Sequence, residues 1–234
     1  MEAIILAGGF GTRLRHVVSD VPKPMAPMDD KGTPFLCVIL NMLKKNGFNR
    51  VILSTGYMSE KVEAYFGNDY KGIKIDYSVE YEPLFTGGAV KKALELCNDK
   101  NVFVLNGDTY FDVDFQAMLK QHIECKSDFT IAVKMMEKFD RYGTIVFNTA
   151  MKIESFKEKC YHDIGWINGG IYCINKNLLR EFPKNKFSLE QDFMEKKIDD
   201  IELYAFKSEG YFIDIGVPED YFKAKLIFEK EVQN

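Results

Sequence analysis

Short apolar runs typical of β-strands alternate with amphipathic stretches typical of helices through the first half of the sequence. The pattern predicts strands at 2–7, 50–55, 72–79 and 101–106, and helices at 34–47, 59–67, 87–97 and 115–125. Strands that alternate with helices form βαβ units, whose strands run parallel and are covered by helices on both faces. The sequence therefore predicts an α/β fold built on a mainly parallel, doubly wound sheet.

The second half changes this pattern. Strands are expected at 128–135, 143–147, 151–156 and 166–175, spaced like a meander, and helices at 189–198 and 218–232. Adjacent short strands favour antiparallel additions to the sheet, which makes it mixed. Because there is no repeat, linker or shift in composition, residues 1–234 are expected to form a single domain.

Charge and cysteine content narrow the classes of partner. The chain has 31 basic and 35 acidic residues, a net charge of −4, and no long basic block, so nucleic acid is not an expected partner. No apolar run approaches the roughly 18 residues of a membrane helix, so no membrane partner is expected either. Five widely spaced cysteines without a CxxC pair predict reduced thiols in a cytoplasmic protein. A homo-oligomer is compatible with the sequence.

The first expected strand ends in a glycine-rich loop, "LAGGFGTRL" at 6–14. Ligands of open α/β sheets bind beyond the carboxyl ends of strands, and glycines let backbone N–H groups approach an anion. Arg13 can add a bidentate contact to phosphate. Leu14 stands where the dinucleotide fingerprint needs its third glycine, and Arg13 and Leu14 replace the lysine and hydroxyl of a P-loop. The loop therefore predicts a phosphate site of another kind.

A second element, "VPKPMAP" at 21–27, holds Lys23 between Pro22 and Pro24. Each proline fixes its own φ and restricts the residue before it. We therefore expect a stiff, extended segment that presents the Lys23 ammonium to the same phosphates as Arg13.

Together these two elements resemble the signature of the sugar-1-phosphate nucleotidyltransferases, also called nucleoside diphosphate-sugar pyrophosphorylases. The resemblance continues through "TGGA" (86–89), "NGD" (106–108), "FKEK" (156–159), "NGGIY" (168–172) and "FIDIGVPEDY" (212–221). It implies a Rossmann-like nucleotidyltransferase fold. It also implies an enzyme that uses Mg²⁺ to transfer a nucleotidyl group to a sugar 1-phosphate and releases pyrophosphate.

The resemblance also assigns residues. It implies three catalytic residues, Arg13, Lys23 and Asp108, and two Mg²⁺ ligands, Asp108 and Asp214. The implied nucleotide-binding residues are Leu6, Ala7, Gly8, Gly9, Gly11, Thr12, Arg13, Thr86, Gly87, Gly88 and Asp108. The implied sugar-phosphate-binding residues are Lys23, Gly143, Glu158, Lys159, Asn168, Gly169 and Glu190. Two positions depart from the family pattern, since Phe85 replaces an expected glycine and Cys160 an expected proline.

The overall likeness implies GTP as the donor and D-glycero-α-D-manno-heptose 1-phosphate as the acceptor, for synthesis of a surface polysaccharide (capsule or lipopolysaccharide) precursor. Mannose 1-phosphate is the alternative acceptor, and UTP, dTTP or CTP are alternative donors. "TGGA" at 86–89 suits a purine as well as a pyrimidine. A nucleotide-sugar binding, regulatory module without catalysis is the alternative outside the enzymes.

Overall fold

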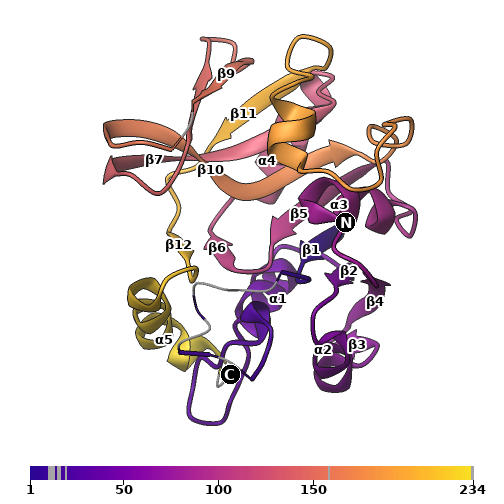
Figure 1. Ribbon diagram of the computed structural model, residues 1–234, viewed down its shortest axis with the longest axis vertical. Helices are drawn as coiled ribbons and strands as arrows, with labels where there is room; N and C mark the ends of the chain where they lie inside the picture. The colour runs from indigo at the N-terminus through magenta and orange to yellow at the C-terminus, as the bar shows by residue number, and fades with distance from the viewer. Residues whose placement is uncertain (10–13, 15–16, 19, 158, 233–234) are drawn as a thin grey trace.

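The computed structural model describes residues 1–9, 14, 17, 18, 20–157 and 159–232. Its main feature is a mixed sheet with the strand order β11-β7-β10-β5-β1-β2-β4-β3, which runs through the molecule in Figure 1. The α/β sheet with antiparallel additions that the sequence predicts is therefore confirmed.

The parallel part of the sheet comes from the first half of the chain. Its strands are β1 (Glu2–Leu6), β2 (Arg50–Thr55), β4 (Ile73–Val79) and β5 (Asn101–Asn106). β1 lies between β5 and β2, and β4 follows β2, all in parallel register. The short β3 (Asp69–Tyr70) adds an antiparallel edge to β4. The near-continuous burial of β1, β2 and β5 is typical of strands covered on both faces.

The antiparallel part centres on β10 (His162–Asn175), which pairs with β5 and with β7 (Phe129–Phe139). β11 (Leu203–Lys207), which the sequence pattern did not predict, runs parallel to β7. The expected meander was wrong, because β7 pairs with β10 and β11. Of the four strands expected there, β8 (Thr144–Phe147) and β9 (Ile153–Lys157) pair as a hairpin, and β8 pairs with β10 at one position. β10 bulges between Asn168 and Tyr172.

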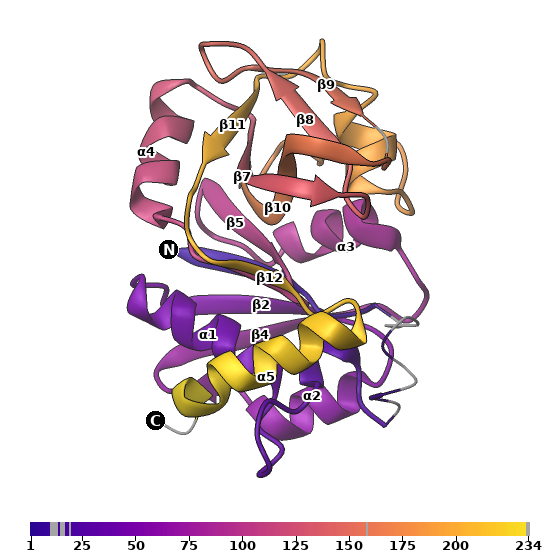
Figure 2. The same ribbon diagram turned by 90° about the vertical axis from the view of Figure 1, so that its left-hand side faces the viewer.

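Helices cover both faces of the sheet. They are α1 (Phe35–Lys45), α2 (Ser59–Phe66), α3 (Phe85–Leu94), α4 (Phe115–Glu124) and α5 (Pro218–Val232). On one face, apolar residues of α1, α4 and α5 pack with Ile5; on the other, those of α3 pack with Ile4. Figure 2 shows α5 beside α1, where the rings of Phe35 and Phe228 lie 6.3 Å apart.

Two short helical turns complete the chain. η1 (Lys23–Met25) is a 3₁₀ turn, and η2 (Leu189–Met194) is π-helical. η2 is shorter than the helix expected at 189–198. Its wide turn comes from the hydrogen bond that the Glu195 N–H donates to the Glu190 carbonyl, five residues back.

None of the helices within the described ranges has the length and apolar character that crossing a membrane requires. All five cysteines carry free thiols.

Candidate active site

A cavity of about 760 Å³ opens at the carboxyl ends of four parallel strands. It is lined by Gly8 and Gly9 after β1, by Gly56 and Tyr57 after β2, by residues 80–83 and 85 after β4, and by residues 106–108 at the end of β5. The strand order is β5-β1-β2-β4. Since neighbouring strands lie about 4.8 Å apart, three spacings extend about 14 Å. The cavity therefore suits an elongated ligand with two chemically different ends.

The charged end of the cavity lies at β5. The Lys23 ammonium donates to Asp108 Oδ2 and lies 3.6 Å from Asp214 Oδ1, while the Lys23 side chain is only 10% exposed. Two carboxylates thus share one buried ammonium, which offsets part of the cost of holding like charges close together.

The pairing of β6 (Thr109–Phe111) with β12 (Phe212–Asp214) brings the two aspartates together across more than a hundred residues. Asp214 lies opposite Thr109, and the Ile215 N–H donates to the Asp108 carbonyl at 2.9 Å. Figure 1 shows β6 and β12 side by side below β7 and β10, with β12 just above α5.

Two glycines allow close packing around this cluster, one against backbone and one against the charged side chains. A Cβ on Gly107 would lie 2.4 Å from the Leu6 carbonyl oxygen. A Cβ on Gly216 would lie 2.9 Å from Asp214 Oδ1 and 3.1 Å from the Lys23 Nζ. The Gly216 N–H donates to Asp214 Oδ1 at 2.7 Å and so fixes this carboxylate.

The segment that carries Lys23 differs from the extended one expected. Pro22 is extended, with φ −65° and ψ 152°, but Lys23 begins the 3₁₀ turn η1, in which the Met25 N–H donates to the Pro22 carbonyl at 2.7 Å. Pro24 permits this because its fixed φ suits the first turn of a helix and its missing N–H is not needed there. The prolines therefore fix Lys23 on a tight turn.

The opposite end of the cavity lies beyond β4 and is rich in aromatic residues. Tyr81 and Phe85 line it, together with Pro83 and the carboxylate of Glu80. Glu80 accepts hydrogen bonds from the Leu84 N–H at 3.0 Å and from Ser54 Oγ at 3.3 Å, so it holds the segment between β4 and α3. Sequence reasoning missed Glu80, although its place after a strand is the same signal that singled out Asp108.

A partly buried hydrogen-bond network reaches the cavity through Glu190. This carboxylate accepts from Thr86 Oγ1 at 2.8 Å, from Ser188 Oγ at 3.0 Å and from the Tyr172 hydroxyl at 3.3 Å. Asn168 Nδ2 in turn donates to the Tyr172 oxygen at 2.9 Å. Burial, followed by the charge of Glu190, raises the pKa of Tyr172, so the phenol remains a donor. Three hydroxyls therefore stabilise a carboxylate that faces the cavity.

The predicted site residues fall into three groups. Those that line the cavity are Leu6, Gly8, Gly9, Lys23, Thr86, Asp108 and Glu190. Asp214 joins them through Lys23, and Asn168 reaches Glu190 through Tyr172. Those that do not line the cavity are Ala7, Gly87, Gly88, Gly143, Lys159 and Gly169. Gly11, Thr12, Arg13 and Glu158 lie outside the described residues.

Gly87 and Gly88 allow α3 to pack closely against the segment that contains Asn185 and Phe187. A Cβ on Gly87 would lie 2.2 Å from the Phe187 ring, and one on Gly88 would lie 2.1 Å from the Asn185 carbonyl oxygen. Both N–H groups donate to the Phe187 carbonyl, so both amides already have a partner within the protein. Gly169 is similar, because a Cβ there would lie 2.4 Å from the Phe111 ring.

Of the other three residues, Ala7 is buried and its N–H donates to the Ser54 carbonyl at 2.7 Å, while Gly143 and Lys159 lie near the β8–β9 hairpin. Gly143 precedes β8, and Lys159 is exposed in the segment between β9 and β10.

Comparison with known proteins agrees with this geometry. Residues 2–231 match the family model described as nucleotidyl transferase. The chain is 53% identical to D-glycero-alpha-D-manno-heptose 1-phosphate guanylyltransferase of Aneurinibacillus thermoaerophilus, over 100% of this chain and 99% of that protein. It is 46% identical to the protein of the same name from Campylobacter jejuni, over 95% and 97%.

Among solved structures, HddC from Yersinia pseudotuberculosis complexed with GMP-PN superposes with a TM-score of 0.85. The identity is 36%, over 97% of this chain and 99% of that one. The fold, the strand-end cavity and these full-length similarities lead to one conclusion: the chain belongs to the nucleotidyl transferase family and has its Rossmann-like fold.

Proposed function

We propose that the protein transfers a guanylyl group from GTP to D-glycero-α-D-manno-heptose 1-phosphate, giving the GDP-linked heptose and pyrophosphate. The observation that carries the proposal is a cavity with the Lys23, Asp108 and Asp214 cluster at one end and an aromatic, carboxylate-bearing segment at the other. The chain that builds it is similar over its full length to a relative with this name. The product would serve as a precursor of a surface polysaccharide, capsule or lipopolysaccharide.

In this reaction an oxygen of the sugar phosphate attacks the α-phosphorus of GTP. A new P–O bond forms between this oxygen and the α-phosphorus. The bond from the α-phosphorus to the oxygen that bridges it to the β-phosphorus breaks, and pyrophosphate leaves. Because the nucleophile is already an anion near neutral pH, no general base is required. None of the described residues that line the cavity is a histidine, which suits this chemistry. Catalysis then consists of positioning and charge neutralisation, with Lys23 against the α-phosphate or the incoming phosphate.

Asp108 and Asp214 would hold Mg²⁺. Their carboxylates are hard oxygen donors close enough to share one ammonium, and Asp108 faces the cavity. Within the described part of the chain, no group of three or more acidic, histidine or cysteine side chains is arranged to hold a metal. This fits Mg²⁺, which takes one or two carboxylates and fills its remaining positions with phosphate oxygens and water. When bound, the ion neutralises charge on the phosphates.

Glu80 supports guanine as the base. A carboxylate only accepts hydrogen bonds, and guanine presents two adjacent donors, N1–H and the N2 amino group. Uracil and thymine present a single N–H on the same edge. A carboxylate beyond β4 therefore complements guanine better than it does these pyrimidines.

A substrate matrix tests the proposal. Four nucleoside triphosphates are combined with heptose, mannose and glucose 1-phosphates, and kcat/KM is measured from pyrophosphate release with Mg²⁺ present. We expect the highest value for GTP with the heptose 1-phosphate, and the GDP-linked heptose as product. A preference for another triphosphate overturns the guanylyl assignment, and a preference for mannose overturns the acceptor. Nucleotide binding without pyrophosphate release from any pair would favour the regulatory module.

We further propose that the chain works as a single domain in the cytoplasm. One ten-stranded sheet contains strands from both halves of the chain, and a reducing compartment preserves its five free thiols. Size-exclusion chromatography with light scattering would show whether copies associate.

A further inference from the structure

Phe85 has an unusual backbone conformation for an aromatic residue. Its φ is +59°, in the left-handed region that glycine adopts without steric cost and bulky residues disfavour. It begins α3, directly after the segment that leaves β4. Unfavourable backbone conformations of this kind concentrate at functional sites, where surrounding contacts and function maintain them. Because glycine would fit this backbone better, the presence of phenylalanine points to a role for its side chain.

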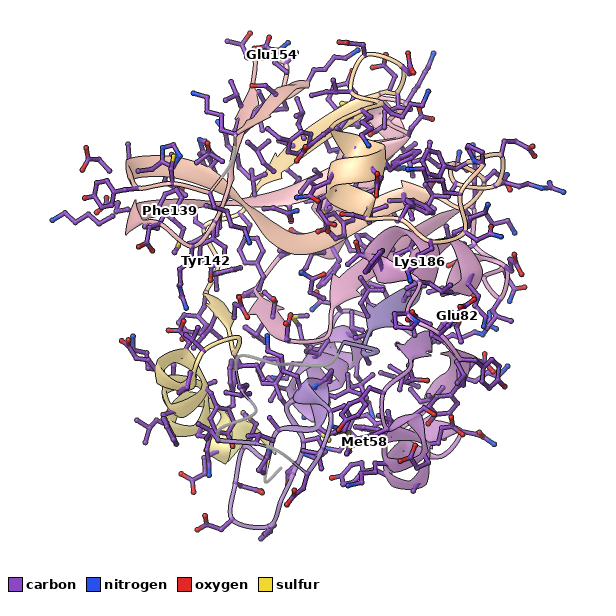
Figure 3. All side chains as sticks on the ribbon, viewed as in Figure 1. Met58, Glu82, Phe139, Tyr142, Glu154 and Lys186 are labelled. Carbon is purple, nitrogen blue, oxygen red and sulfur yellow. The ribbon has the colours of Figure 1, made fainter. Side chains whose placement is uncertain are left out.

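The Phe85 side chain lies open to the cavity. It is 59% exposed and contributes to the cavity lining. The Lys186 ammonium lies 5.1 Å from the ring centroid and occupies one face of the ring. Figure 3 shows Lys186 on the same side of the molecule as Glu82, which belongs to the segment leading to Phe85. An exposed ring with a cation over one face resembles a stacking platform.

We propose that Phe85 stacks on the guanine base of the bound nucleotide and contributes directly to its affinity. This inference rests on the proposed function. Phe85 follows the segment after β4 and lines the same cavity as Asp108, and β4 is three strands away from β5 in the sheet order. A nucleotide with its phosphates at Lys23 and its base toward the β4 end would therefore place the base near the ring. Glu80, at the same end, would read the edge of the base while Phe85 covers its face.

Phe85→Gly tests the proposal, because glycine fits the backbone better than phenylalanine does. The variant should be at least as stable as the wild type, so unfolding cannot explain weaker binding. Base–aromatic stacking commonly changes affinity by roughly 5- to 150-fold. We expect the Kd for GTP, measured by calorimetry with Mg²⁺, to rise by about tenfold. The inhibition constant of inorganic tripolyphosphate, which has no base, should not change.

Two further variants sharpen the test. Phe85→Asn also tolerates a positive φ and should weaken GTP in the same way. Lys126→Gly is the matched control, because Lys126 has φ +50°, is exposed after α4 and does not line the cavity. It should relieve backbone strain equally and leave the Kd for GTP unchanged.

Unchanged GTP affinity in both Phe85 variants would overturn the stacking role, as would an equal loss for GTP and tripolyphosphate. Failure of the proposed function would show differently, as wild-type protein that releases no pyrophosphate from GTP.

Discussion

At the scale of single residues, Lys23 is the centre of the charged end of the cavity. Its ammonium contacts Asp108 and lies 3.6 Å from Asp214, so it balances two carboxylates that come from distant parts of the chain. Because the Lys23 side chain is only 10% exposed, little water screens its charge, and the ammonium keeps much of its electrostatic strength. In the proposed reaction it would act on a phosphate that gains charge in the transition state.

We expect Lys23→Ala to lower kcat/KM by about two orders of magnitude, the usual effect of losing one preorganised donor. Lys23→Arg should not restore activity. The compact ammonium contacts one carboxylate and lies 3.6 Å from a second, and a planar, forked guanidinium does not reproduce this arrangement. Pyrophosphate release from GTP provides the measurement. Lys223→Ala, which removes a lysine paired with Glu219 on α5, is the control and should behave as wild type. Activity of Lys23→Ala within a few fold of wild type would exclude this role.

The sequence motifs pointed to Lys23 and Asp108, because short local patterns carry both. They could not point to Tyr172 as the link between Asn168 and Glu190. That contact depends on how the bulge of β10 meets η2, and long-range side-chain packing leaves no local pattern. The same limit applies to Gly87, whose small size is explained by the Phe187 ring a hundred residues later.

At the scale of elements, strong periodicity gave the most reliable predictions. Strands β2 and β5 and helix α5 have the bounds that the sequence predicts. In the first half only the short strands β3 and β6 were missed. The larger errors lie in the second half, where β11 was missed and β7 was paired with the wrong neighbour. Short half-buried strands specify their own conformation but not their partner, which is set by the long β10 that packs against both β5 and β7.

One element-scale prediction concerns the packing of α4 on β7. His122 is 1% exposed, and its Nδ1 lies 2.8 Å from Thr130 Oγ1. Its Nε2 has no hydrogen-bond partner among the described residues. Burial lowers the pKa of His122 from 6.5 to about 4. The unfolded chain therefore binds a proton below pH 6.5 that the folded protein does not bind until about pH 4.

Stability should consequently be lost as the pH falls from 6.5 to 4, by up to about 3 kcal/mol from this group alone. Urea unfolding at a series of pH values measures the free energy of unfolding directly. His122→Asn keeps an amide near the position of Nδ1 but cannot titrate, so this part of the pH dependence should disappear. The same acid dependence in the variant would show that other groups cause it.

At the scale of the whole molecule, the cavity joins distant parts of the chain. Gly8 follows the first strand, Glu190 belongs to η2, and Gly216 comes just before the last helix. The sheet topology creates this proximity. β1 lies in the middle of the sheet, and the pairing of β12 with β6 brings the segment around Asp214 to the carboxyl end of β5. The fold class could be predicted from sequence, but this convergence could not, since it depends on strand order and on the β6–β12 register.

A ligand bound across these segments should stabilise the whole fold. A ligand present at a hundred times its Kd adds about 2.7 kcal/mol to the free energy of unfolding. For a chain of this size, that raises Tm by about 5–10 °C. We expect GTP with Mg²⁺ to produce such a shift and UTP to produce a much smaller one, because Glu80 has fewer donors to accept from uracil. Differential scanning fluorimetry measures both shifts.

Asp108→Asn combined with Asp214→Asn should remove most of the GTP shift, because the proposed metal ligands would be lost and the phosphates would remain unneutralised. An equal shift for GTP and UTP would show that the base is not read, and a full GTP shift with excess EDTA would show that the metal does not contribute to binding.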